Sequence, residues 1–232
     1  MKRYKKQQKV REHMKTMLTV LLVTTAVIAA AVVLLIINNN SMFQYERSLD
    51  KTVLIVQGEE VKLKELSYYF MIEEESVNET ALTYDPENPR AYWNLYINST
   101  FVSVAARDTA IDYFLRDRLY YRLAMEEGMG LTEEEWEEVY RRADAMVTDM
   151  TPKQQRLGMT EEDLIIALEK HQMADNYVLK HAKEQELTMS EEVLSAYFGL
   201  NSPFFKEQKQ KAEVKYKDRI LDKIRLGNLT IN

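Results

Sequence analysis

The stretch MLTVLLVTTAVIAAAVVLLII, residues 17–37, determines how the rest of the chain is interpreted. Its 21 residues contain no charged residue, no glycine and no proline. A helix of about 20 apolar residues spans the hydrocarbon core of a bilayer. A soluble helix of this length normally has a polar side, whereas this stretch has only three threonines. We therefore predict a transmembrane anchor at residues 17–37.

A basic segment, residues 1–16, precedes the stretch and holds seven Lys or Arg residues against one acid, Glu12. The cytoplasmic flanks of membrane helices carry an excess of Lys and Arg. We therefore expect a single-pass protein of the cell membrane with a cytoplasmic N-terminus. The residues from 38 onward are expected to be extracytoplasmic.

A cleaved signal peptide is the alternative interpretation of the same stretch. Such a peptide has an apolar region of about 7–15 residues that ends at a small-residue A-x-A site. The triplet AAA at residues 29–31 is followed by six more apolar residues, which favours an uncleaved anchor. The chain also has no cysteine that could carry a bacterial lipid anchor.

Charge is distributed unevenly along the chain. The whole chain has a net charge of −6, but 24 basic and 36 acidic residues follow the anchor, so residues 38–232 carry −12. An acidic exterior disfavours a nucleic-acid partner, because nucleic-acid binding requires a basic surface. The absence of cysteine excludes a disulfide scaffold, thiol catalysis and cysteine-ligated metal, and it favours a bacterial protein.

The residues after the anchor begin with a polar stalk, residues 38–51. The β-branched run TVLIV at residues 52–56 follows, and Gln57 and Gly58 then predict the turn of a small β-hairpin. A helix is expected over Lys64–Glu75. The proline-containing segment Ser76–Arg90 is expected to be a loop.

Helix start signals recur through the rest of the chain. Thr100 is expected to cap a long helix that runs to Glu127, where Gly128 provides a left-handed stop. Further helices are expected to begin at capping residues followed by proline or acids: Thr132, Thr151, Thr160, Ser190 and Ser202. The last is expected to run to Gly227. The predicted fold is therefore all-α, with a helical domain over residues 52–199 and a basic C-terminal helix in residues 200–232 that packs back on it.

Three motifs resemble the SurA/PrsA class of extracytoplasmic chaperones. VQGEEV at residues 56–61, followed by Glu65, resembles the strand, V-N-G-x-x-I turn and helix that open those domains. Gln57 replaces the usual Asn, and Lys62 stands where a Ser, Thr or Asp cap is usual. LAMEEG at 123–128 with LTEEE at 131–135, and GMTEEDL at 158–164, are similar to the next helix junctions, so the resemblance covers residues 52–185.

The resemblance implies a helical chaperone domain of the SurA N-terminal, trigger-factor C-terminal-like kind. Its partners would be unfolded or nascent exported polypeptides. Many relatives also contain a parvulin prolyl-isomerase domain, which is too large for the 33 residues after Gly199, so we expect no prolyl isomerase activity. In relatives the C-terminal helix packs on the N-terminal lobe, so Leu229 and Ile231 are expected to add a strand beside residues 53–56.

Side chains that could support catalysis or hold a cofactor are sparse. His171 and His181 stand ten residues apart, on different faces of a helix, and no i, i+4 histidine pair exists for a metal. His171 follows Leu164 and Leu168 on the apolar side and is interpreted as a satisfied core histidine. The acids at 133–138 occupy the first turns of a helix, where they complement its dipole. We expect no enzyme activity, no metal and no cofactor.

Methionine and aromatic side chains are the candidate binding residues. Methionine is unbranched and polarisable, which suits surfaces that accept varied sequences. The candidates for a peptide-binding groove are Met125, Met129, Trp136, Tyr140, Met146 and Met150. The alternative is that these side chains fill the core.

These observations predict a membrane-anchored, non-catalytic, chaperone-like protein that binds unfolded exported polypeptides. The alternative is a non-catalytic scaffolding subunit that binds one defined partner at the cell surface. No oligomeric state is predicted from the sequence.

Overall fold

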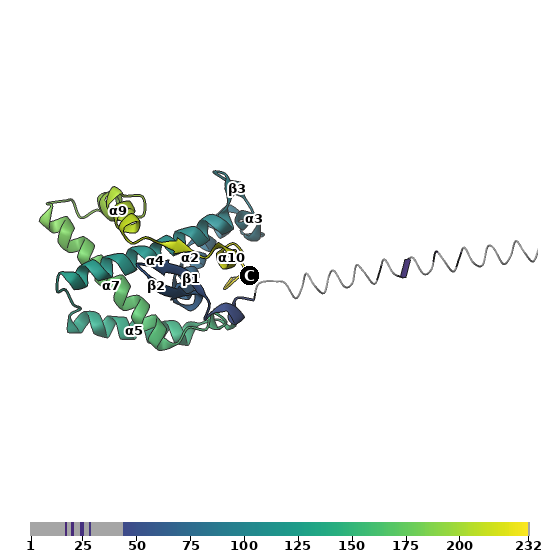
Figure 1. Ribbon diagram of the computed structural model, residues 1–232, viewed down its shortest axis with the longest axis horizontal. Coiled ribbons are helices and arrows are strands. Elements are labelled where there is room, and N and C mark those ends of the chain that lie inside the picture. Colours follow the sequence, from purple (N-terminus) through teal and green to yellow (C-terminus); the bar gives the residue numbers. More distant parts are fainter. Residues whose placement is uncertain (1–16, 18–19, 21–23, 26–27, 29–43, 232) are drawn as a thin grey trace, which may run out of the picture. The chain divides into compact units, whose positions relative to one another are not determined.

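The computed structural model of the chain describes residues 17, 20, 24, 25, 28 and 44–231 (Figure 1). The chain divides into two units, Met1–Phe43 and Gln44–Asn232. The predicted basic segment 1–16, all but five residues of the predicted anchor 17–37, and residues 38–43 of the predicted stalk lie outside the described residues. The five described residues of the first unit have helical backbone. Within the described residues, no helix is both long enough and apolar enough to cross a membrane.

The prediction of a mainly α-helical chain is confirmed, since 65% of the described residues are helical and 8% are in strands. In the second unit, α4 (Val102–Glu126) packs against α2 (Leu63–Tyr84) and α7 (Glu161–Glu184) (Figure 1). Helix α5 (Glu133–Asp149) also packs against α7. Helix α4 is therefore central, and side chains on its buried face contact two long helices at once.

A three-stranded antiparallel sheet follows the short 3₁₀ helix η1 (Glu46–Ser48). Its strands are β1 (Thr52–Val56), β2 (Glu59–Lys62) and β5 (Lys215–Tyr216), in the order β2-β1-β5. The turn residues Gln57 and Gly58 both have positive φ, 55° and 85°. A two-residue turn of this kind matches the right-handed twist of the flanking strands. The predicted hairpin is therefore present.

The prediction of a loop over Ser76–Arg90 is wrong for its first part. Helix α2 continues to Tyr84, because this segment has no glycine or proline before residue 86 and Ala81 is fully buried in the core. The helix ends at Asp85, whose φ and ψ of −149° and 95° are extended. That conformation is favoured for a residue that precedes proline, here Pro86.

The prediction that Thr100 caps the central helix is also wrong. A short helix, α3 (Arg90–Trp93), is followed by a second hairpin of β3 (Tyr96–Ile97) and β4 (Thr100–Phe101). Thr100 therefore lies in a strand. Phe101 occupies the N-cap of α4 and provides no side-chain hydrogen bond to it.

Helix boundaries further along the chain are confirmed. Gly128, at φ 70°, ends the last turn of α4, and the Met129 N–H donates to the Ala124 carbonyl at 2.9 Å. Side-chain caps are present at each later predicted start: Thr132, Thr151, Thr160, Ser190 and Ser202. They begin, in order, α5, α6 (Pro152–Gln155), α7, α8 (Glu191–Phe198) and α9 (Pro203–Lys211).

The predicted basic helix from Ser202 to Gly227 is wrong beyond its first turns. Helix α9 ends at Lys211, and the chain continues as β5, the short α10 (Asp218–Leu221) and an irregular tail. Glu213 adopts a left-handed φ of 48°, which redirects the chain so that residues 215–216 pair with β1. The third strand of the sheet is thus β5, and the prediction that residues 229 and 231 would form it is wrong.

The tail is held in place by a buried carboxylate on α2. Glu74 is fully buried and accepts hydrogen bonds from the backbone N–H groups of Gly227, Asn228 (3.1 Å), Leu229 (3.0 Å) and Thr230 (2.6 Å). The Thr230 hydroxyl donates a further bond to it. The C-terminal tail therefore packs back on the helical domain, as an irregular segment where a helix was predicted.

Candidate functional site

An open cleft of about 750 Å³ lies where α4, α7 and α8 meet. Ligand sites in proteins commonly have volumes of about 300–1,000 Å³. From α4 the cleft receives Thr109, Tyr113 and Arg116, whose spacing of four and then three residues places them on one helix face. The same geometry places lining residues of α7 and α8 on the faces that meet α4.

The walls of the cleft combine apolar with polar side chains. Helix α7 contributes Val178 and Leu179, and α8 contributes Leu194 and Phe198. Leu179 is 39% exposed and Tyr113 is 44% exposed, so both present apolar surface to solvent. Apolar side chains of a bound polypeptide would gain about 25 cal/mol for each Å² that they bury here.

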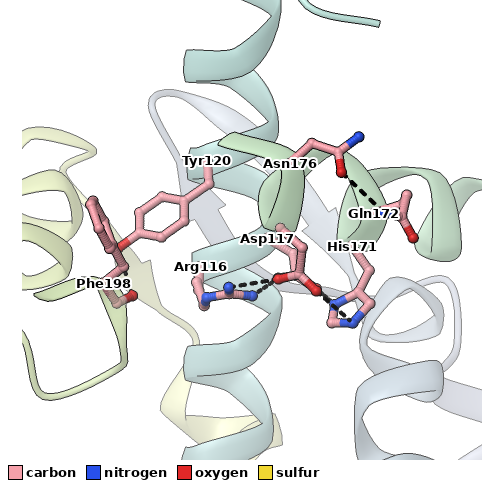
Figure 2. Close-up of polar contacts among 8 residues, drawn as sticks. Arg116, Asp117, Tyr120, His171, Gln172, Asn176 and Phe198 are labelled. Atoms are coloured by element: carbon pink, nitrogen blue, oxygen red, sulfur yellow. Dashed lines mark hydrogen bonds and ion pairs between the residues drawn. The ribbon is translucent and has the colours of Figure 1, made fainter. Parts of the chain in front are cut away.

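An ion-pair network lies beside the cleft, and two of its members, Arg116 and Asp175, line it (Figure 2). Asp117 of α4 is almost fully buried, and its carboxylate receives the Arg116 Nη1 at 2.8 Å and lies 2.8 Å from the His171 Nδ1. The Arg116 Nη2 donates to the carboxylate of Asp175 at 2.7 Å. Asp175 lies on α7, four residues after His171. One guanidinium group therefore bridges two helices, and both of its terminal nitrogens are occupied.

Ionisation in this network is set by competition between burial and charge. Burial lowers the pKa of His171, but the hydrogen bond to Asp117 and the charges of Asp117 and Asp175 outweigh it, so the pKa of His171 is raised. Burial likewise lowers the pKa of Arg116, and the same two acids raise it above its ordinary value. The network is therefore held together by charge-assisted hydrogen bonds, which are about twice as strong as neutral ones.

Glu73 is a further carboxyl near the cleft, and burial dominates its environment. Burial raises the pKa of Glu73 on α2 to about 7. Burial, and then the charge of Glu73, raise the pKa of the cleft residue Tyr113. Near neutral pH this part of the site therefore carries less negative charge than its acidic residues suggest.

An aromatic cluster fixes α8 at the cleft. The Tyr120 hydroxyl of α4 donates to the Phe198 carbonyl at 2.9 Å (Figure 2), and the Tyr120 ring lies 5.5 Å from the ring of Phe204. After Phe198 the chain approaches itself so closely that a Cβ on Gly199 would lie 2.4 Å from the Ser195 carbonyl oxygen. Glycine is therefore required where α8 ends and the cleft wall turns.

The cleft has the size and the mixed apolar and polar lining of a ligand-binding site. Arg116 and Asp117 are engaged by each other and by their neighbours, so the network fixes the cleft geometry. Within residues 44–231 and the five described residues of the first unit, no group of three or more His, Cys, Asp or Glu side chains is arranged to hold a metal ion. His171 is hydrogen-bonded, as interpreted from the sequence, but its side chain is 35% exposed, so it is not a fully buried core residue.

The six candidate binding residues from the sequence do not line this cleft. Trp136 and Tyr140 are brought together on α5, where their rings stack with centroids 5.6 Å apart. Met125 is 52% exposed at the end of α4, whereas Met150 is buried. Met129, in the connection after α4, and Met146, on α5, are partly exposed.

The buried acids that sequence reasoning missed carried one usable signal. Asp117 follows Ala110 and Phe114 at helical spacing, on the buried face of α4. Glu74 follows Phe70 on the buried face of α2 in the same way. An acid on an apolar helical stripe is costly unless it is paired, so each position indicates a specific partner. Neither partner could be identified from spacing, because His171 and the tail are distant in sequence.

Comparison of the chain with models of protein families, with curated proteins and with solved structures found no match. The resemblance to SurA/PrsA chaperones therefore rests on the three sequence motifs. What it implies about function stays a prediction.

Proposed function

We propose that this protein is a non-catalytic, chaperone-like protein that binds unfolded segments of exported polypeptides in the cleft between α4, α7 and α8. Residues 17–37 anchor it in the cell membrane, with residues 1–16 in the cytoplasm and the second unit outside. The apolar stretch and the basic residues before it support this placement.

The observation that carries the proposal is the combination of exposed apolar side chains with polar and charged groups in one open cleft. Leu179, Leu194 and Tyr113 offer surface to apolar side chains without requiring a particular sequence. Polar groups at the rim, such as Asn201 and Thr109, are available to backbone amides and carbonyls. Pockets of this kind bind mainly by apolar burial and are oriented by a few polar groups.

The test compares two exposed apolar residues of the same helix. Leu179, which lines the cleft, and Ile166, which does not, are 39% and 42% exposed on α7. The full-length protein in lipid nanodiscs would be titrated with fluorescently labelled, chemically unfolded polypeptides of several sequences. We expect Leu179→Ser combined with Tyr113→Ser to weaken binding about tenfold, from lost apolar burial, and Ile166→Ser to leave it unchanged.

Thermal unfolding of each variant separates lost binding from lost folding. Equal weakening by Ile166→Ser, or no affinity of the parent protein for any unfolded chain, would overturn the proposal. A single tight ligand together with no affinity for the others would also overturn it and favour a scaffolding subunit that binds one partner.

A further inference from the structure

The β3–β4 hairpin presents large apolar side chains to solvent. Tyr96, Ile97 and Phe101, which we call the hairpin tip, are 65%, 45% and 43% exposed. The two turn residues, Asn98 and Ser99, both have positive φ, 51° and 68°, so the turn is tight and the tip residues stand directly beside it. Tyr96 pairs with Phe101 across the hairpin, and their ring centroids are 5.2 Å apart.

The base of the hairpin is anchored in the second unit. Trp93, in the helix before it, is buried and packs so closely on Gly227 that a Cβ there would lie 2.4 Å from the indole ring. The Val102 N–H donates to the Leu95 carbonyl at 3.0 Å, and the Leu226 N–H donates to the Ser103 carbonyl at 3.1 Å. The hairpin is thus fixed at its base while its tip is exposed (Figure 1).

One guanidinium group lies at the hairpin tip, and a second is on α3, the short helix that precedes the hairpin. The Arg225 guanidinium lies 5.8 Å from the centre of the Phe101 ring, and Arg90 donates to the Asn228 side chain at 3.4 Å. Both arginines are exposed. The neighbouring acid Asp85 accepts hydrogen bonds from backbone N–H groups of its own loop, which engages one oxygen of its carboxylate. Exposed tyrosine and phenylalanine beside arginine is the composition of surfaces that lie at a lipid–water interface.

The connection between the predicted anchor and the second unit is short. Only residues 38–43 separate the predicted anchor from Gln44. Six residues extend at most about 20 Å at 3.3–3.6 Å each. With the anchor inserted, Gln44 would stay within about 20 Å of the end of the anchor, so the surface of the second unit would meet the bilayer at high effective concentration.

We propose that the β3–β4 hairpin is a second membrane contact, in which the hairpin tip enters the interfacial layer of an anionic bilayer and Arg90 and Arg225 bind lipid phosphates. The proposal rests on the anchored topology given under Proposed function. The contact restrains the second unit on the membrane surface instead of leaving it to rotate on its tether.

The absence of cysteine allows single labelled positions to test this contact. Ile97→Cys and Met189→Cys form a matched pair, since the parent side chains are 45% and 44% exposed. Each full-length variant would carry an environment-sensitive dye and be reconstituted in phosphatidylcholine vesicles with or without phosphatidylglycerol. We expect a blue shift and several-fold stronger quenching by shallow nitroxide lipids at position 97 than at 189, increased by phosphatidylglycerol.

Substitution of both arginines by Gln in the Ile97→Cys protein tests the charge contribution. We expect it to abolish the increase that phosphatidylglycerol produces. Equal quenching at 97 and 189 would overturn the proposal, and so would a shift at 97 without lipid quenching but with a doubled particle mass, which would identify a second copy as the occupant.

A third probe separates failure of the hairpin contact from failure of the anchor. Ala26→Cys lies in the middle of residues 17–37. Quenching by deep nitroxide lipids at 26 without shallow quenching at 97 overturns the hairpin contact alone. No quenching at 26 overturns the anchor and, because the hairpin contact rests on it, overturns the contact as proposed.

Discussion

Two buried carboxylates, Glu74 on α2 and Asp117 on α4, are stabilised in opposite ways. Glu74 is surrounded by four backbone N–H groups and one hydroxyl from the C-terminal tail, and all of these donors are electrically neutral. Asp117 is paired with the charged side chain of Arg116 and with His171. Both acids lie on apolar helical stripes, and each would be costly to bury without its partners.

This difference in partners suggests different roles for the two carboxylates: Glu74 makes a fixed structural contact, and Asp117 makes a contact that can rearrange. Backbone N–H groups are fixed in position by the chain and carry no net charge, so the bonds between the tail and Glu74 depend on how the tail is placed. Of the partners of Asp117, His171 can lose its proton, and Arg116, which lines the cleft, has a second partner in Asp175. We therefore infer that the Glu74 contact mainly stabilises the fold and that the Asp117 network couples stability to the state of the cleft.

The largest expected effect is from Glu74→Gln. The amide keeps one acceptor oxygen but turns an NH₂ group toward the N–H and hydroxyl of Thr230, so donors face donors. Loss of charge-assisted bonds in a fully buried site predicts destabilisation by about 3–5 kcal/mol, measured by urea unfolding.

Glu79→Gln, at an exposed position of the same helix, is the matched control and should change stability by less than about 0.5 kcal/mol. Protease cleavage of the tail should accelerate in Glu74→Gln and not in the control. Similar stabilities for the two variants would show that the tail is held mainly by its apolar contacts.

Asp117→Asn should have a smaller effect, about 2 kcal/mol in urea unfolding. The amide that replaces the carboxylate retains one acceptor oxygen, Arg116 keeps its ion pair with Asp175, and His171 can lose its proton. The exposed Asp144→Asn on α5 is the control. A loss as large as that of Glu74→Gln would contradict the view that the partners of Asp117 can rearrange.

Glu73, adjacent to Glu74, shows what burial does to a carboxyl without such compensation. Because its native pKa is raised from 4.5 to about 7, the native state favours the protonated form, and stability is lost as the pH rises from about 4.5 through 7. Glu73→Gln should therefore be more stable than the parent by about 1 kcal/mol at pH 8 and equal to it near pH 4. A destabilised variant at pH 8 would mean that the charged carboxylate has a favourable partner.

Local signals in the sequence predicted much of the fold, because they act over three or four residues. Thr132 and Thr160 cap the helices that they were expected to begin, and the Gln57–Gly58 turn produces the first hairpin. The errors occurred where distant contacts decide the conformation. Residues 212–231 do not continue the helix that begins at Ser202, because β1 and Glu74 provide partners for this backbone that a local pattern cannot reveal.

The cleft was less predictable than the fold for a related reason. Methionine content indicated adaptable surface near α5, but whether Met150 faces solvent or the core depends on how α5 packs on α7. The cleft instead forms where α8 meets α4, and its position depends on Tyr120 reaching the Phe198 carbonyl, 78 residues further along the chain. The detectable signal was an acid, Asp117, on an apolar stripe.

The smallest expected effect is a change in the pH dependence of stability in His171→Gln. The native pKa of His171 is raised from 6.5, because Asp117 and Asp175 outweigh burial. Protonated His171 therefore contributes stability that is complete below pH 6.5 and is lost as the pH rises through the higher native pKa. His171→Gln should remove this contribution, so that the parent exceeds the variant in stability at pH 6 and the two converge at pH 9.

Asp117→Asn should flatten the pH profile of stability in the same way, whereas Glu74→Gln should lower stability without changing this slope. If Glu74→Gln altered the slope over this range as strongly as Asp117→Asn, the two carboxylates would not be separate structural and adjustable contacts.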